Sequence, residues 1–234
     1  MTTRLLLPLL FLTSPAFAGA FTPPEGCTAT LTMQARGCYV SNYYTCPTDN
    51  AGDQWRADFD QEGMFYMSKI DSETQWVESY SLNPTVKQTL DANPKDPASF
   101  SDLLATGRDD FDFSLTKDTG EHTNVKGYDK LTGETVVIDG VTLQRTEYDY
   151  EETDDEGNML RQSHGNEYIS AEWRNFFSGT SEWFDGTDWL PLDGSPVQFF
   201  LPGDKGFGAT QPLYECDAVM SDAGPLAPLL KPVA

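Results

Sequence analysis

The sequence predicts a mostly β protein: a single antiparallel meander that forms a curved open sheet or a flattened barrel, with one short helix at about residues 97–106. Apolar and polar residues alternate in many short runs, which is the period-two pattern of half-buried strands. Glycine, proline, asparagine and aspartate separate these runs at intervals of about ten residues. The chain has 234 residues, 38% of them hydrophobic, which is enough for one folded core. We therefore expect a single β domain over residues 19–221.

Residues 1–18 have the three parts of an export signal. Arg4 provides a positive charge, residues 5–12 form a short apolar run, and residues 16–18 have the small-x-small pattern of a cleavage site. The apolar run is much shorter than the roughly 20 residues that span a bilayer, and Pro8 interrupts it. The sequence therefore predicts a signal peptide, no transmembrane segment, and a periplasmic or secreted protein.

The first third of the chain predicts antiparallel strands joined by short turns. The expected strands are 28–34, 39–45, a strand ending at 59, a strand beginning at 64, and 75–82. In the third of these, Trp55, Ala57 and Phe59 alternate with polar residues at 54, 56 and 58. Because successive side chains of a strand point to opposite faces, this pattern predicts one face toward the core and one toward solvent.

Residues 83–107 break this pattern and contain the predicted helix. Asp96 is placed to cap it, and Pro97 suits the first helical position. The apolar residues at helical spacing are Phe100, Leu103 and Leu104. Gly107 ends the helix. A helix of about three turns is not stable alone, so we expect it to lie across the sheet or to fill one end of it.

The meander resumes at residue 108. Phe111, Phe113 and Leu115 alternate with polar residues, and Asp139-Gly140 is the dipeptide that a type I′ hairpin turn requires. Further strands are expected at 135–138, 141–143, a segment ending at 152, 159–170, 172–177, 182–184 and 197–201. The segment 222–234 contains several prolines and has no period, so it is predicted to be a loose tail.

The four cysteines, Cys27, Cys38, Cys46 and Cys216, are an even number in an exported chain, which favours disulfides. Four cysteines allow three pairings. Antiparallel pairing about the turn at 35–37 brings Cys27 opposite Cys46, within the roughly 5.5 Å between Cα atoms that a disulfide requires. The preferred pairing is therefore Cys27–Cys46 and Cys38–Cys216. The second bond would join the end of the domain to the first hairpin.

Charge and missing motifs exclude several classes of function. The chain has 15 lysines and arginines against 37 aspartates and glutamates, a net charge of −22. Nucleic acids and anionic membranes are polyanions, so we expect neither as a partner. Zinc-ligand spacings and nucleotide-binding fingerprints are absent from the sequence, and no cofactor is predicted. The oligomeric state is left open.

One acidic turn is a calcium candidate, because oxygen-bearing side chains are the ligands that Ca²⁺ takes. Its residues are Asp154, Asp155, Glu156 and Asn158. Their order does not match the EF-hand loop, which needs acids at alternate positions and a glutamate at its end. An exposed hairpin turn with Gly157 at a positive-φ position accounts for the same residues. No other metal site is predicted.

The sequence predicts no catalytic residue. His122 and His164 are its two histidines, and Ser163 cannot pair directly with His164 because neighbours in a strand point to opposite faces. The G-x-S-x-G nucleophile motif is absent from the sequence. Two carboxylates could act as in a glycosidase, but such an enzyme would need a deep acidic pocket with one carboxylate buried.

Aromatic residues that gather late in the chain are the feature most relevant to function. The candidates for ligand binding are Trp173, Phe176, Phe177, Trp183 and Trp189. Trp173 and Phe177 share one face of a predicted strand, and Phe176 lies on the other. A strand that is aromatic on both faces is either packed between two layers or presents an apolar surface to a ligand. Core packing and a groove for an apolar or sugar ligand both remain open.

The order of features resembles that of uncharacterised exported bacterial proteins. The resemblance rests on residues 74–79 (TQWVES), on 195–197 with 202–203, and on the closing segment 212–216 (PLYEC). In overall plan the chain also resembles the periplasmic carriers of outer-membrane lipoproteins, in which an open curved sheet holds acyl chains beneath a helix. That second resemblance implies an apolar ligand but transfers no residue, because it shares no motif.

These features predict an exported, non-catalytic binding or carrier module for an apolar small molecule or lipid in the bacterial envelope. Two alternatives remain. One is a carboxylate-dependent hydrolase acting on a glycan or an ester, and the other is a structural or partner-binding envelope protein.

Overall fold

The computed structural model describes residues 19–216. The predicted signal peptide, residues 217–221 and the predicted tail lie outside this range. The described residues form 13 strands and one short helix, so the predicted fold class is confirmed. The elements are β1 (Thr28–Ala35), β2 (Tyr39–Thr45), β3 (Gln54–Phe59), β4 (Met64–Ile70), β5 (Trp76–Leu82), β6 (Thr85–Leu90), α1 (Phe100–Thr106), β7 (Arg108–Lys117), β8 (His122–Ile138), β9 (Val141–Thr153), β10 (Met159–Ser170), β11 (Asn175–Phe184), β12 (Trp189–Asp193) and β13 (Pro196–Phe200). Among these residues, no helical segment has the length and hydropathy of a membrane span.

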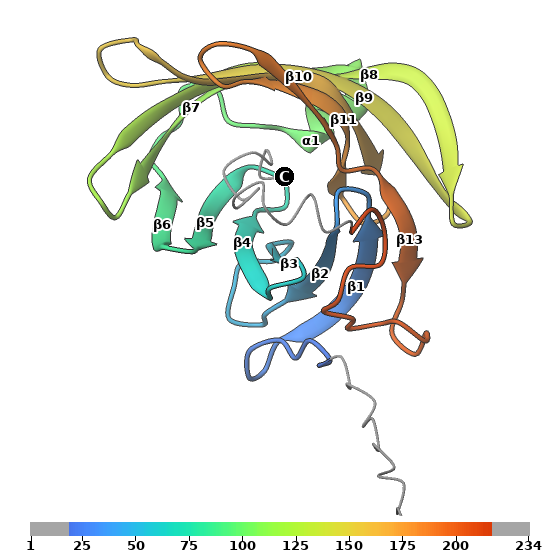
Figure 1. Cartoon of the computed structure of the whole chain (residues 1–234). Helices are drawn as coiled ribbons and strands as arrows, with labels where there is room; N and C mark the ends of the chain where they lie inside the picture. Colours follow the sequence, from blue (N-terminus) through green and yellow to red (C-terminus); the bar gives the residue numbers. More distant parts are fainter. Residues whose placement is uncertain (1–18, 217–234) are drawn as a thin grey trace, which may run out of the picture.

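All 13 strands belong to one antiparallel sheet in which neighbours in the chain pair with one another, with one exception. The order is β12-β11-β10-β9-β8-β7-β6-β5-β4-β3-β2-β1-β13. β13 follows β12 in the chain but pairs with β1 at the opposite edge. Figure 1 shows the sheet curling round on itself, with α1 inside the curve. Over the described residues, β12 and β13 do not pair, so the sheet is curved and open.

The helix starts later than predicted. Asp96 does not cap it, because Asp96 forms an antiparallel bridge with Asp112 and the chain stays extended there. Ser99 is the cap, and its hydroxyl accepts a hydrogen bond from the backbone N–H of Asp102 at 3.2 Å. Gly107 ends the helix as predicted, with φ of 85°.

The prediction missed β6 and β12, found only residues 135–138 of β8, and divided β9 and β11 into two strands each. β6 lies in the segment that was expected to break the pattern, and β12 was not predicted. Both are half-buried or exposed along their length, so neither has a clear apolar face. β11 is continuous where strands at 172–177 and 182–184 were predicted. Residues 171–174 form a turn instead, in which Arg174 has φ of 45°.

The prediction that residues 56 and 58 face solvent is wrong. Arg56 and Asp58 are buried, and the Arg56 Nε atom lies 3.0 Å from the Asp58 carboxylate. Ser41 donates its hydroxyl hydrogen to Asp58 at 2.6 Å. The other face of β3 is covered too, since the rings of Phe21 and Phe59 pack at 5.8 Å. β3 is therefore enclosed on both faces, and the two buried charges compensate each other.

Two hydrophobic cores lie against the sheet. The first core packs beneath α1 and contains Ile70, Trp76, Phe100, Leu103, Phe111, Phe113, Leu115, Val125, Tyr148, Tyr150, Ile169 and Phe176. The second core joins β1, β2, β9, β11 and β13 and contains Leu31, Met33, Ala35, Tyr39, Tyr43, Leu143, Phe177 and Phe199. Because Phe176 and Phe177 are consecutive, they point to opposite faces of β11, and each belongs to a different core.

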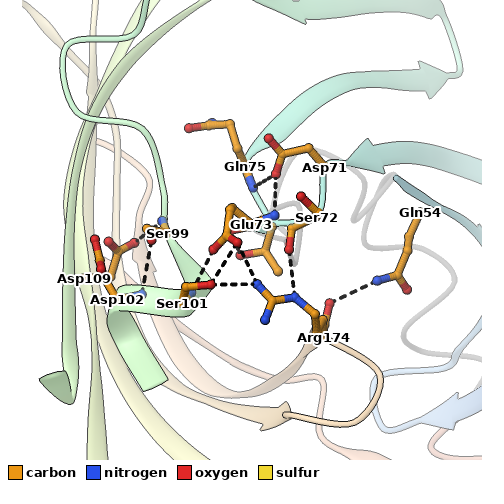
Figure 2. Close-up of polar contacts among 11 residues, drawn as sticks. Gln54, Asp71, Ser72, Glu73, Gln75, Ser99, Ser101, Asp102, Asp109 and Arg174 are labelled. Atoms are coloured by element: carbon orange, nitrogen blue, oxygen red, sulfur yellow. Dashed lines mark hydrogen bonds and ion pairs between the residues drawn. The ribbon is translucent and has the colours of Figure 1, made fainter. Parts of the chain in front are cut away.

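Polar contacts attach α1 to two turns of the sheet (Figure 2). Phe100 donates its backbone N–H to the Glu73 carbonyl at 3.0 Å, and the Ser101 N–H and hydroxyl donate to the Glu73 carboxylate at 2.8 and 2.9 Å. Arg174, between β10 and β11, donates to the Ser72 carbonyl at 2.9 Å and to the Glu73 carboxylate at 3.0 Å. We call Glu73, Ser101 and Arg174 the helix clamp. It joins α1 to the β4–β5 turn and the β10–β11 turn.

Both preferred cysteine pairs are bonded. Cys27 and Cys46 close the open end of the β1–β2 hairpin, with their Cα atoms 4.2 Å apart. Cys38, in the turn of that hairpin, is bonded to Cys216, with Cα atoms 4.7 Å apart. The last described residue is thereby fixed to the first two strands.

Candidate functional site

Three of the five predicted ligand-binding residues lie in or against the cores. Phe176 packs edge-on against Phe100 of α1, with ring centroids 5.5 Å apart. Phe177 lies 5.1 Å from Phe199 in the second core. Trp173 is half-buried and packs on Phe177 and Phe199 at 6.0 and 5.5 Å. This part of β11 is thus packed between two layers.

Trp183 and Trp189 lie near the other end of β11, on opposite faces of the sheet. Phe184 pairs with Trp189 and Trp183 pairs with Leu190, so Phe184 and Trp189 share a face. Trp189 is 38% exposed, the most exposed of the five predicted residues. Its ring lies 4.3 Å from the His164 ring and 5.6 Å from the Phe184 ring. These neighbours hold the Trp189 ring in place at the surface.

A groove with a volume of about 440 Å³ crosses β10, β11 and β12 beside these rings. It is lined by His164, Gly165, Thr180, Ser181, Glu182, Pro191, Leu192 and Asp193. We call it the edge groove, because β12 is an edge strand of the sheet. His164 lines the groove and also packs at a tilt against Trp189, so Trp189 lies at one end of the edge groove.

Two glycines allow β10 and β11 to approach closely at this site. A Cβ atom on Gly165 would lie 2.5 Å from the Thr180 carbonyl oxygen, and one on Gly179 would lie 2.5 Å from the Asn166 carbonyl oxygen. Both contacts are too short for any other residue unless the backbone moves. The pairing of the two strands also shifts between Gly165 and Glu167. This bulge separates the part of β10 that lines the groove from its buried part.

Two carboxylates line the edge groove, and both side chains are partly exposed, 51% for Glu182 and 40% for Asp193. His164 Nε2 lies 3.3 Å from the Glu182 carboxylate. Asp193 accepts a hydrogen bond from the backbone N–H of Ser195 at 3.0 Å, and Arg36 lies 3.7 Å from it. Glu182 is therefore the more exposed of the two carboxylates, and it has no bond to the backbone of the turn among the described contacts.

The calcium candidate is a turn whose carboxylates have other partners. Asp154 accepts hydrogen bonds from the backbone and side-chain nitrogens of Asn158 at 2.7 and 2.8 Å. Asp155 contacts His122, and Glu156 is exposed. Over residues 19–216, no three His, Cys, Asp or Glu side chains are grouped so that they could hold a metal ion.

His122 lies between two carboxylates from different parts of the chain. Its Nδ1 atom is 2.5 Å from Asp155, and its Nε2 atom is 2.8 Å from Asp91. The hydrogen bond to Asp155 is the main reason that the His122 pKa is raised above 6.5. The Thr116 hydroxyl donates to Asp91 at 2.7 Å and not to the imidazole. The arrangement therefore links the end of β6, the start of β8 and the β9–β10 turn.

Two buried carboxylates beneath α1 were missed in the sequence. Asp109 and Asp129 face each other on β7 and β8, and both are buried. Asp109 accepts a hydrogen bond from the Ser99 N–H at 2.9 Å. Burial, with a smaller contribution from Asp129, raises the pKa of Asp109 to about 7. Asp109 lies two residues before Phe111, so the period of β7 places it on the apolar face, and that signal could have identified it.

Comparisons with known proteins show no family. No family model matches the sequence, and no curated protein matches it. Among solved structures, the chain is similar to a protein of Bacteroides fragilis described as a candidate exported protein with a YmcC-like fold. The identity is 11% and the TM-score 0.41, over 78% of this chain and 99% of that chain. This neighbour does not support the resemblance to lipoprotein carriers.

Proposed function

We propose that this protein is a non-catalytic binding module that acts outside the cytoplasm and takes its ligand in the edge groove. The observation that carries the proposal is the exposed Trp189 ring, packed at a tilt against His164 at the end of a groove of about 440 Å³. Small-molecule sites are concave and combine aromatic side chains with a few polar groups. The edge groove provides this combination with Trp189, His164 and Glu182.

The disulfides support an extracytoplasmic location. Cys27–Cys46 and Cys38–Cys216 are both formed, and such bonds are rare in the reducing cytoplasm. They agree with the signal peptide predicted at residues 1–18. The periplasm and the cell exterior both satisfy this requirement.

The ligand is expected to present an apolar face to Trp189. Covering an exposed ring removes apolar surface from water, at roughly 25 cal/mol per Å². His164 and Phe184 hold the ring in place before a ligand arrives, so little side-chain freedom is lost on binding. An open groove also lets a carrier release its ligand without any rearrangement of the cores.

The hydrolase alternative has less support from the geometry. Asp109 is the buried carboxylate whose pKa is suited to proton transfer near neutral pH. It lies beneath α1 and is bonded to the backbone of Ser99, whereas the edge groove lies on β10, β11 and β12. The acid with the required pKa and the groove are therefore formed by different parts of the sheet.

A neutral apolar dye tests the proposal. We expect Nile red fluorescence to rise on addition of the native protein, and Trp189→Ala to weaken this binding about tenfold. Leu213→Ala is the matched control, because Leu213 is 64% exposed but lies outside the groove. Equal dye binding by the native protein and Trp189→Ala would overturn the proposal. Circular dichroism of each variant checks that the sheet is intact.

A further inference from the structure

The edge groove combines an apolar ring with polar groups that suit hydroxyl ligands. Glu182 provides carboxylate acceptors, Thr180 provides a hydroxyl, and His164 provides a ring nitrogen. Trp189, at the end of the groove, provides an aromatic face. A sugar ring has a face of C–H groups and a rim of hydroxyls, so it can stack on the tryptophan while it bonds to the polar groups.

The surroundings of the groove disfavour an acyl chain. Its lining includes charged or polar side chains on all three strands: His164 on β10, Glu182 on β11 and Asp193 on β12. Burying these groups under a hydrocarbon chain would leave them without water or other partners. A ligand that carries its own hydroxyls replaces that water.

The charge near the groove disfavours anionic ligands. Glu182 and Asp193 line it, and Asp185 and Asp188 belong to the turn that joins β11 to β12. The whole chain has a net charge of −22. Fatty acid carboxylates, phospholipid head groups and acidic sugars would all meet like charge here, which lowers both the affinity and the rate of encounter.

We propose that the ligand of the edge groove is a neutral saccharide, stacked on Trp189 and hydrogen-bonded to Glu182. This inference rests on the proposed binding function and specifies the class of its ligand. Glu182 points from the same face of β11 as Phe184, which contacts Trp189, so one sugar unit can reach both the ring and the carboxylate.

Calorimetric titration with defined oligosaccharides tests this inference. The probes are maltohexaose, cellohexaose and chitohexaose as neutral chains, hexagalacturonate as an acidic chain, and palmitate as an acyl ligand. We expect at least one neutral chain to bind, and Trp189→Ala and Glu182→Gln each to weaken it about tenfold. Trp189→Phe should retain part of the affinity because it keeps a ring, and Leu213→Ala should bind as the native protein does.

Two results would overturn the saccharide inference, and neither of them alone overturns the proposed binding function. If palmitate or hexagalacturonate binds in preference to all neutral chains and Trp189→Ala abolishes that binding, the groove is a binding site for another class of ligand. If none of the five probes binds, the saccharide inference is wrong, and the Nile red titration then decides separately whether the groove binds anything. Unchanged thermal unfolding of Glu182→Gln confirms that its loss of affinity is local.

Discussion

The guanidinium of Arg174 and the carboxylate of Glu73 lie 3.0 Å apart although 101 residues separate them in the chain. Arg174 comes from the β10–β11 turn and Glu73 from the β4–β5 turn, and Ser101 of α1 is bonded to the same carboxylate. The helix clamp therefore connects three elements that no backbone ladder joins. Its strength determines how firmly α1 covers the first core.

Removing one side of this ion pair should destabilise the protein modestly. We expect Arg174→Met to lower the free energy of unfolding by about 1 kcal/mol, because both partners are about one-third exposed and water screens them. Urea unfolding measures this. A double-mutant cycle of Arg174→Met with Glu73→Gln should show coupling. The control Lys130→Met breaks an exposed pair with Glu147 and should lower the free energy of unfolding by less than Arg174→Met does. Additive effects of Arg174→Met and Glu73→Gln would contradict the clamp.

The link at His122 should make stability depend on pH. Its pKa is raised in the folded protein, chiefly by Asp155, so the folded state favours the charged imidazolium. The stabilisation is complete below the unfolded pKa of 6.5 and is lost as pH rises through the higher folded pKa. Thermal unfolding of the native protein and His122→Gln at about pH 6 and pH 9 tests this. The unfolding temperature of the native protein should exceed that of His122→Gln by more at the lower pH. An equal difference at both pH values would refute the link.

Asp109 should destabilise the protein at alkaline pH. Its pKa rises from 3.8 to about 7 on folding because it is buried. The folded state therefore favours the neutral carboxyl, and this contribution declines from pH 3.8 upward and is gone above pH 7.

Asp109→Asn should remove this dependence while keeping an oxygen for the Ser99 N–H. The difference in free energy of unfolding between the variant and the native protein should shift in favour of the variant by on the order of 2 kcal/mol when the pH is raised from 5 to 8.5. Urea unfolding at the two pH values measures the gain. Asp110→Asn, one residue along β7 and exposed, is the control and should show no such gain. If Asp109→Asn and the native protein change in parallel with pH, the carboxyl is not the source.

The two disulfides should contribute unequally to the free energy of unfolding. In the chain-entropy account, a bond stabilises more when it closes a longer loop. Cys38–Cys216 spans 178 residues and Cys27–Cys46 spans 19, so their removal should cost about 5 and about 3 kcal/mol. Paired serine substitutions, compared by urea unfolding, give both values. A larger loss for the Cys27–Cys46 pair would show that local geometry outweighs loop length.

The features that were predicted correctly from the sequence are turns and hairpins, which depend on residues close together in the chain. The Asp139-Gly140 turn has positive φ at both positions, 48° and 80°, as a type I′ hairpin requires. The same hairpin logic paired Cys27 with Cys46. The prediction of Asp96 as the helix cap was wrong because it depends on a contact with another segment. Asp96 forms a bridge with Asp112, and Ser99 caps the helix instead.

The candidate site was partly predictable for the same reason. Trp189 was among the predicted residues because aromatic clustering is visible in the sequence. Its neighbours were not, because His164 contacts Trp189, and Glu182 contacts His164, only through the pairing of β10, β11 and β12. The shift in that pairing at Gly165 cannot be deduced from strand lengths alone.

Residues 194 and 195 connect β12, at one edge of the sheet, to β13, at the other edge. The last strand, β13, therefore pairs with the first, β1. A chain that is synthesised amino end first forms β1 early, whereas β13, which pairs with the free edge of β1, is made nearly last. For most of its synthesis the polypeptide therefore has an unpaired edge on β1 that can pair with other chains. Truncation at any point before residue 196 would leave that strand bare permanently, so an incompletely synthesised copy should aggregate.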